Sequence, residues 1–298
     1  DVDDLLHKKY KKVTTKSSYP LPYVGHTIDR HGRYGFKLSM PGYIDKMMRD
    51  FNVQGNARTP ATENLFKVEE ESPKLNEREA KMFHTKTASL LYIAIRVRPD
   101  IQTAVNFLSS RVREPTEEDA RKLDRLLKYV NCTKEMGIVF DGPMTLDVYV
   151  DASHAVHRDR KSHTGGCILL NGGPIYTTSV KQKITSKSST EAELVAVSDV
   201  LSMVLWTQQF LKELGQGDII AHLYQDNTST IRLIERGHSN CDRTRHIESR
   251  YFFITEKINE GKISVEHKPT CDMIADMLTK PIQGALFRKL RKALLNED

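Results

Sequence analysis

The hydrophobic pattern of the sequence changes near residue 144, and this change constrains the fold more than any other feature. Before it, apolar residues recur at helical spacing in three segments, 77–94, 100–112 and 116–131. After it, Leu146, Val148 and Val150 alternate with polar residues, as in a half-buried strand that ends at Asp151. A switch from a helical period to a period of two predicts that a second structural unit begins there.

The elements expected after residue 144 form an ordered series. Asn171-Gly172-Gly173 separates two strand-like runs and is a hairpin signal. The expected series is three antiparallel strands, a helix from about Thr190 to Leu214, a strand ending at Gln225, a short helix to Gly237, a helix at 246–260, a strand at 262–267 and a helix from about residue 271. This order predicts an α/β fold, a mixed sheet with flanking helices.

Residues 21–143 are expected to form a smaller, mostly helical α+β region. Residues 21–38 have the pattern of a hairpin, and 40–51 that of an amphipathic helix. Thr116 and Asp119 have capping-box spacing at the start of the last helix. The basic run before residue 18 is expected to have no regular structure. Since 298 residues allow about two domains, we predict the division 1–20, 21–143 and 144–298.

Composition narrows the class of protein further. The net charge of +6 permits a nucleic-acid partner without requiring one. The four cysteines are scattered and lack Cys-x-x-Cys spacing, which argues against a zinc site or a disulfide framework. No stretch approaches the roughly 18 apolar residues of a membrane span, so no membrane partner is expected.

Four acidic residues lie at the ends of the expected elements: Asp151, Glu193, Asp226 and Asp276. Asp151 and Asp226 each close a strand, while Glu193 and Asp276 lie near the start of a helix. Phosphodiester hydrolysis by two Mg²⁺ ions about 3.5–4 Å apart needs such a convergence of carboxylates. Each residue taken alone is more simply a solvated acid, and Glu193 also has capping-box spacing from Thr190. The ordered set is the stronger signal and predicts a metal site.

Five segments between residues 144 and 282 carry a family resemblance: Tyr149-Val150-Asp151-Ala152-Ser153, Lys187-Ser188-Ser189-Thr190-Glu191-Ala192-Glu193, Gln225-Asp226-Asn227, Arg245-His246-Ile247-Glu248-Ser249-Arg250-Tyr251 and Ala275-Asp276-Met277-Leu278-Thr279-Lys280. In this order they resemble the ribonuclease H domain of copia-type LTR retrotransposon Pol polyproteins. The resemblance implies a ribonuclease H-like fold and metal-dependent endonucleolytic hydrolysis of the RNA strand of RNA–DNA hybrids during reverse transcription. It implies that the four carboxylates are catalytic and bind two Mg²⁺ ions, with Mn²⁺ as the alternative. It also selects Glu193 over Glu191.

The front of the chain resembles the end of the reverse transcriptase of the same polyproteins. Val2-Asp3-Asp4 resembles the end of the palm motif Tyr-x-Asp-Asp, with Asp1 in place of the tyrosine, and 21–143 resembles the thumb and connection. The fingers and most of the palm are expected to be missing, so DNA polymerisation by this chain alone is not expected. The implied partners are an RNA–DNA hybrid and the remainder of the Pol polyprotein, including the fingers, palm and integrase. The implied location is a cytoplasmic virus-like particle, with the nucleus as the alternative.

Residues around the carboxylates are candidates for contacts with the hybrid. Lys187, Ser188 and Ser189 lead into a helix and are candidate ligands of a backbone phosphate. A solvated loop with an ordinary helix cap explains these three residues equally well. Ser153 and Asn227, each beside a carboxylate, are candidates for contacts with the 2′-hydroxyl that distinguishes RNA from DNA.

Three basic residues are weaker candidates. Arg250 is expected on the same strip of a helix as His246 and is a candidate nucleic-acid contact. His246 and His267 are candidate auxiliary residues that shuttle protons or assist product release. A packed or surface histidine is the simpler interpretation of both.

Two other functions compete with an active nuclease. The first is a catalytically idle or co-opted retrotransposon fragment that binds nucleic acid without turnover. The second is an integrase-like enzyme on the same fold, whose acidic residues come in the order Asp, Asp, Glu. The order here is Asp, Glu, Asp, Asp, which argues against it.

Overall fold

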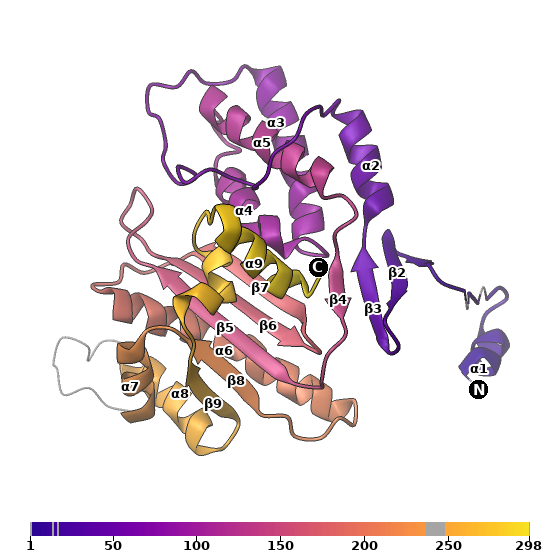
Figure 1. Ribbon diagram of the computed structural model, residues 1–298, viewed down its shortest axis with the longest axis vertical. Helices are drawn as coiled ribbons and strands as arrows, with labels where there is room; N and C mark the ends of the chain where they lie inside the picture. The colour runs from indigo at the N-terminus through magenta and orange to yellow at the C-terminus, as the bar shows by residue number, and fades with distance from the viewer. Residues whose placement is uncertain (1, 14, 17, 237–247, 298) are drawn as a thin grey trace.

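The computed structural model describes residues 2–297, apart from positions 14, 17 and 237–247. Figure 1 shows a large sheet and a small sheet with helices packed around them. The large sheet has the strand order β7-β6-β5-β8-β9 and is built from the chain after residue 144. The small sheet has the order β1-β2-β3-β4 and is built from the chain before it.

The large sheet confirms the expected mixed α/β fold. Its strands are β5 (Leu146–Ser153), β6 (His163–Leu170), β7 (Gly173–Lys181), β8 (Ala221–Gln225) and β9 (Ile263–His267). The first three are antiparallel neighbours, while β8 and β9 run parallel to β5. The hairpin between β6 and β7 turns at Asn171 and Gly172, whose φ angles of 52° and 79° are those that an Asn-Gly turn accommodates.

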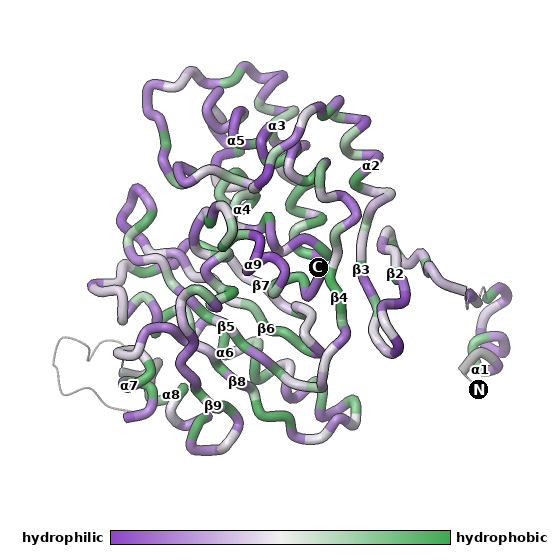
Figure 2. Tube along the Cα trace, viewed as in Figure 1, coloured by the Kyte–Doolittle hydropathy of each residue, from purple (hydrophilic) through white to green (hydrophobic). Residues whose placement is uncertain are grey.

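Both faces of β5 are covered, because successive side chains of a strand point to opposite sides. Val148 and Val150 belong to one apolar cluster, shared with α6 (Ser189–Glu213), α8 (Glu248–Asn259) and one buried residue of α7 (Thr228–Arg236). Tyr149 belongs to another cluster on the opposite face, shared with the front region and with α9 (Gly284–Leu295). In Figure 2 hydrophobic residues accordingly follow the central strands.

The front region forms a small sheet and four helices. Its elements are β1 (Leu21–Tyr23), β2 (His26–His31), β3 (Gly35–Ser39), α2 (Pro41–Asp50), α3 (Glu77–Ala94), α4 (Gln102–Ser110), α5 (Glu117–Cys132) and β4 (Ile138–Phe140). The predicted capping box of Thr116 and Asp119 is confirmed at the start of α5. The predicted hairpin pairs with β4 rather than with the large sheet.

The front region packs directly on the large sheet. Gln102 and Asn106 of α4 donate side-chain hydrogen bonds to the carbonyl oxygens of Thr177 and Ser179, on the edge strand β7, at 3.2 and 2.7 Å. The same apolar cluster runs from α2–α5 to Tyr149 of β5. The two regions therefore share a core, and the division 1–20, 21–143 and 144–298 stays a prediction.

Two local expectations were wrong. The basic run before residue 18, expected to have no regular structure, begins inside a helix, α1 (Val2–Lys9). The chain from residue 271 forms not one helix but two 3₁₀ turns, η3 (Thr270–Asp272) and η4 (Ile274–Leu278), with α9 beginning only at Gly284. Extended backbone at Met273 separates the two turns, and Pro281 disfavours helical backbone at the residue before it.

Helix α6 is the central helix of the large sheet. Among the described residues it alone is long and apolar enough to span a membrane by length and composition, but half of its apolar window is buried inside the protein. It packs on β5 and β6 (Figure 1). Its apolar composition is therefore explained by its place in the core.

Candidate active site

Asp151 lies near the carboxyl end of the central strand β5 and is 2% exposed. Thr279 donates its hydroxyl to Oδ2 of Asp151, and Lys280 Nζ lies 3.2 Å from the same oxygen. These partners reach Asp151 because the residue paired with it on β6 is Gly165. A Cβ at Gly165 would lie 2.6 Å from Thr279 Cγ2 and 2.9 Å from the Ala275 carbonyl oxygen. The glycine thus lets the η4 turn approach the strand.

Glu193 is in the second turn of α6 and points toward the sheet. The helix is capped by Ser188, whose hydroxyl accepts a hydrogen bond from the backbone of Glu191 at 3.2 Å. The Glu191 carboxylate in turn accepts from the backbone N–H of Lys187 at 2.7 Å. The alternative interpretation of Thr190 and Glu193 as a capping pair is therefore excluded, because the helix begins earlier in the sequence, with Ser188 as its cap. This shift leaves the Glu193 carboxylate available to the site.

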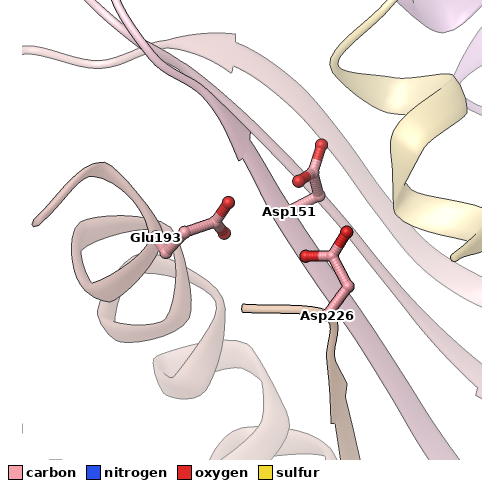
Figure 3. A group of neighbouring side chains, drawn as sticks. All are labelled: Asp151, Glu193 and Asp226. Atoms are coloured by element: carbon pink, nitrogen blue, oxygen red, sulfur yellow. The ribbon is translucent and has the colours of Figure 1, made fainter. Parts of the chain in front are cut away.

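Asp226 follows β8 directly and accepts a hydrogen bond from the Thr270 hydroxyl at 2.9 Å. Because β8 is parallel to β5, the ends of the two strands meet at one edge of the sheet. Figure 3 shows the carboxylates of Asp151, Glu193 and Asp226 turned toward one another from three different elements. One ligand oxygen from each lies within 4.8 Å of the others, a spacing that one metal ion can bridge.

Asp276 belongs to the η4 turn and is 2% exposed. Its Oδ1 lies 2.7 Å from Lys280 Nζ, and this lysine also contacts Asp151. Asp276 is thus beside Asp151, but it is outside the group of three whose oxygens lie within 4.8 Å in the described chain. The structure brings all four predicted carboxylates to one edge of the sheet, three of them in a tight group.

Burial and mutual repulsion act on these acids together. Burial, followed by the charges of Asp151 and Asp226, raises the pKa of Glu193 to about 9. Burial, followed by the charge of Asp151, raises the pKa of Asp276 to about 7, although Lys280 opposes the shift. The carboxylates of Glu193 and Asp276 are thus harder to ionise than free carboxylates, because burial and neighbouring negative charges oppose ionisation. A cation bound among them would offset this repulsion and would itself be stabilised.

Glu193 should make the stability of the metal-free protein pH-dependent. The pKa of Glu193 in the folded protein lies above its ordinary value of 4.5. The folded protein therefore binds this proton more tightly than the unfolded chain does, and protonation of Glu193 stabilises the folded state. That contribution is fully present below about pH 4.5 and is lost as the pH rises through about 9. In EDTA, we expect this loss to lower the melting temperature between about pH 5 and pH 9, and to do so less in Glu193→Gln. Parallel profiles for the two proteins would contradict the assignment of the shift to Glu193.

The weaker candidates are placed around this cluster in different ways. Ser153 is buried at the end of β5, and Asn227 caps α7 by accepting from the backbone of Ser229 at 3.0 Å and Thr230 at 3.2 Å. His267 is exposed and ends β9, opposite Gln225.

The phosphate-binding candidates lie at the start of α6. Lys187 and Ser189 are exposed, and Ser188 is the helix cap already described. His246 and the side chains of Arg250 and Asp3 lie outside the described residues, and the side chain of Asp4 is exposed on α1.

Sequence reasoning missed four residues that hold the carboxylates. Thr279 and Lys280 contact Asp151, Thr270 contacts Asp226, and Gln225 Nε2 donates to Oε2 of Glu193 at 3.2 Å. Lys280 stands four residues after Asp276, a spacing that brings charges together in a helix. This spacing was one available signal, and the place of Gln225, Thr279 and Lys280 in the segments that carry the family resemblance was another.

No protein-family model matches the chain. The chain is 32% identical over 259 residues to the retrovirus-related Pol polyprotein from transposon TNT 1-94 of Nicotiana tabacum, a match that covers 84% of this chain and 19% of that protein. It is 37% identical over 209 residues to the corresponding polyprotein from transposon RE1 of Arabidopsis thaliana, covering 67% and 14%. It is 24% identical over 276 residues to the transposon Ty1-LR3 Gag-Pol polyprotein of Saccharomyces cerevisiae, covering 88% and 16%. The chain spans less than a fifth of the length of these relatives.

Solved structures are similar to about half of the chain. LC11-RNase H1, isolated from compost, aligns at 17% identity with a TM-score of 0.36, over 46% of this chain and 93% of that one. A foamy viral protease-reverse transcriptase in complex with dsDNA aligns at 17% identity with a TM-score of 0.32, over 46% of this chain and 94% of that one.

Proposed function

Because this chain is a homologue of the retrovirus-related Pol polyproteins of copia-type transposons, we propose that it is the ribonuclease H of such a polyprotein. Its reaction is the endonucleolytic hydrolysis of the RNA strand of an RNA–DNA hybrid. The observation that carries the proposal is the convergence of Asp151, Glu193 and Asp226, with ligand oxygens within 4.8 Å of one another. A structural or purely binding role has no need of three mutually repelling acids at one edge of a sheet.

The donor set suits Mg²⁺, which prefers hard oxygen ligands, and also Mn²⁺. Asp151, Glu193 and Asp226 would hold the cation, and Asp276 lies beside them to complete a site for two ions. Two such cations, when bound, supply Lewis-acid stabilisation of the attacking and leaving oxygens in an in-line phosphoryl displacement.

The residues around the acids keep the site in position. Thr279 holds Asp151, Gln225 orients Glu193, and Thr270 holds Asp226, each through a hydrogen bond. Asp151, Glu193 and Gln225 are almost fully buried, so the surrounding protein restricts their movement. The acids thus stand in fixed positions before the substrate arrives, which is the condition for electrostatic preorganisation.

We propose that the hybrid contacts the edge of the sheet through the weaker candidates. Ser153 and Asn227 flank two of the acids and would contact the RNA strand near its 2′-hydroxyls. Lys187, Ser188 and Ser189 would contact a backbone phosphate at the start of α6, where the positive end of the helix dipole favours an anion. Arg250 is proposed to contact the nucleic acid. His246 and His267 are proposed to shuttle protons or to assist product release.

The front region is proposed to act as a reverse transcriptase thumb and connection do, by supporting the hybrid beside the nuclease. DNA synthesis is proposed to require the other parts of a Pol polyprotein, including the fingers and palm, with the integrase as a further partner. The proposed location is a cytoplasmic virus-like particle, with the nucleus as the alternative.

A cleavage assay tests the proposed reaction. A hybrid labelled on its RNA strand is incubated with the chain in Mg²⁺, in Mn²⁺ and in EDTA, with single-stranded RNA and duplex DNA as controls. We expect cleavage of the hybrid alone, only with a divalent cation, and products that carry 5′-phosphate and 3′-hydroxyl ends. Binding of the hybrid without cleavage in either cation would instead support the catalytically idle fragment.

A further inference from the structure

Lys280 lies between two of the acids of the candidate site. Its Nζ is 2.7 Å from Oδ1 of Asp276 and 3.2 Å from Oδ2 of Asp151. Both carboxylates are 3% exposed, whereas the lysine side chain is 39% exposed. The ammonium group therefore lies between two buried acids on a side chain that is itself partly exposed to solvent.

The position of Lys280 is built into the backbone. Its N–H donates to the carbonyl oxygen of Asp276 at 2.9 Å, which closes the η4 turn and directs the side chain back over the acid. Thr279, the preceding residue, binds the same Oδ2 of Asp151 that Lys280 contacts. Pro281 follows and restricts the backbone of Lys280. A lysine on a free surface loop would have none of these constraints.

The contact of Lys280 with Asp151 and Asp276 sets the charge balance of the site. Among the residues described in the structure, Lys280 is the one cation within ion-pair distance of any of the four acids. Burial disfavours the charged lysine, but the carboxylates of Asp151 and Asp276 outweigh it and raise the pKa of Lys280. Two of the four acids, Asp151 and Asp276, therefore share the charge of Lys280.

We propose that Lys280 is an internal competitor of the divalent cation. Its ammonium group offsets part of the negative charge of Asp151 and Asp276. It weakens cation binding because it occupies one oxygen of each carboxylate and repels a second positive charge. Lys280 is thus a positioning residue that sets the cation concentration at which the site fills. This inference rests on the proposed function, since it assumes that the acids bind a divalent cation.

The test is Mn²⁺ binding to the full chain without nucleic acid, measured by the electron paramagnetic resonance signal of free Mn²⁺. Lys280→Met keeps most of the side-chain volume and removes the charge. Because a positive charge beside the ligands then no longer repels the cation, we expect the variant to bind Mn²⁺ about tenfold more tightly. Lys280→Arg keeps the charge and should bind as the wild type does. Lys289→Met is the matched control, because Lys289 pairs with Asp272 at 2.6 Å, outside the cluster.

Thermal unfolding provides a second readout. In EDTA, Lys280→Met should melt below the wild type, since its acids lack their counter-ion, and Mn²⁺ should raise its melting temperature more than that of the wild type. Unchanged or weaker Mn²⁺ binding by Lys280→Met would overturn the proposal. If that variant instead bound hybrid more weakly, Lys280 would be a substrate contact. Cleavage by the wild type together with unchanged Mn²⁺ affinity of the variant would overturn this inference and leave the nuclease intact.

Discussion

Asp226→Asn is expected to lower the rate of hybrid cleavage in Mg²⁺ at least about a hundredfold, the loss typical of removing one preorganised electrostatic group. The amide keeps the shape of the side chain but removes negative charge from the group whose oxygens lie within 4.8 Å of one another. Asp226 is the best acid to change, because it is half-buried and lacks the lysine contact of Asp151 and Asp276. The measurement is the single-turnover rate on labelled hybrid.

Asp218→Asn is the matched control for this substitution. Asp218 is an exposed aspartate that pairs with Lys212 at 2.9 Å, away from the cluster. We expect it to cleave as the wild type does, and both variants to keep the wild-type circular dichroism spectrum and hybrid affinity. Near wild-type cleavage by Asp226→Asn would remove Asp226 from the metal site, however close it lies to Asp151.

Arg98→Met should lower the free energy of unfolding by about 3–5 kcal/mol, the range for breaking a buried ion pair. The side chains of Arg98 and Asp100 are fully buried, and Arg98 donates to both carboxylate oxygens of Asp100 at 2.9 and 2.8 Å. Asp100 also accepts from the Tyr129 hydroxyl at 2.6 Å, and Arg291 of α9 donates to that hydroxyl at 3.2 Å. Loss of the guanidinium leaves the buried Asp100 carboxylate without its main counter-charge.

Urea unfolding of a set of variants tests this expectation. The double variant Arg98→Met with Asp100→Asn should lose less than the sum of the two single losses, because the two residues are coupled. Lys74→Met breaks the exposed pair with Glu114, whose side chains are 68% and 72% exposed, and should cost less than about 1 kcal/mol. An Arg98→Met loss no larger than that of Lys74→Met would show that the buried pair contributes little to stability.

Local patterns in the sequence predicted the elements well where a few neighbouring residues decide the structure. The alternation from Leu146 to Val150 predicted a strand, and Asn171-Gly172 predicted the turn of a hairpin. The strand was expected to be half-buried, whereas the structure covers both of its faces. Thr116 and Asp119 predicted the start of α5. Each of these depends on the backbone geometry of one strand, turn or helix end, so it can be derived without knowing the rest of the fold.

The convergence of the predicted acids depends partly on local sequence patterns and partly on the tertiary structure. The positions of Asp151 and Asp226 at strand ends follow from periodicity, and parallel pairing brings the ends to one edge. The rest of the site needed the three-dimensional structure. The cap at Ser188, rather than at Thr190, is what leaves the Glu193 carboxylate available to the cluster, and several overlapping Ser and Thr residues made the cap ambiguous.

The sequence by itself determined the order and type of the strands of the large sheet, because periodicity is a short-range property. It also placed four acids at the ends of the expected elements, and the family resemblance selected Glu193 over Glu191. Only the tertiary structure decided that β3 pairs with β4, although α2–α5 lie between them in the sequence, and that α4 docks on β7. It also decided that Gly165 admits the η4 turn, and so places Lys280 against Asp151. Such contacts depend on which surfaces pack together, and no spacing along the chain encodes them.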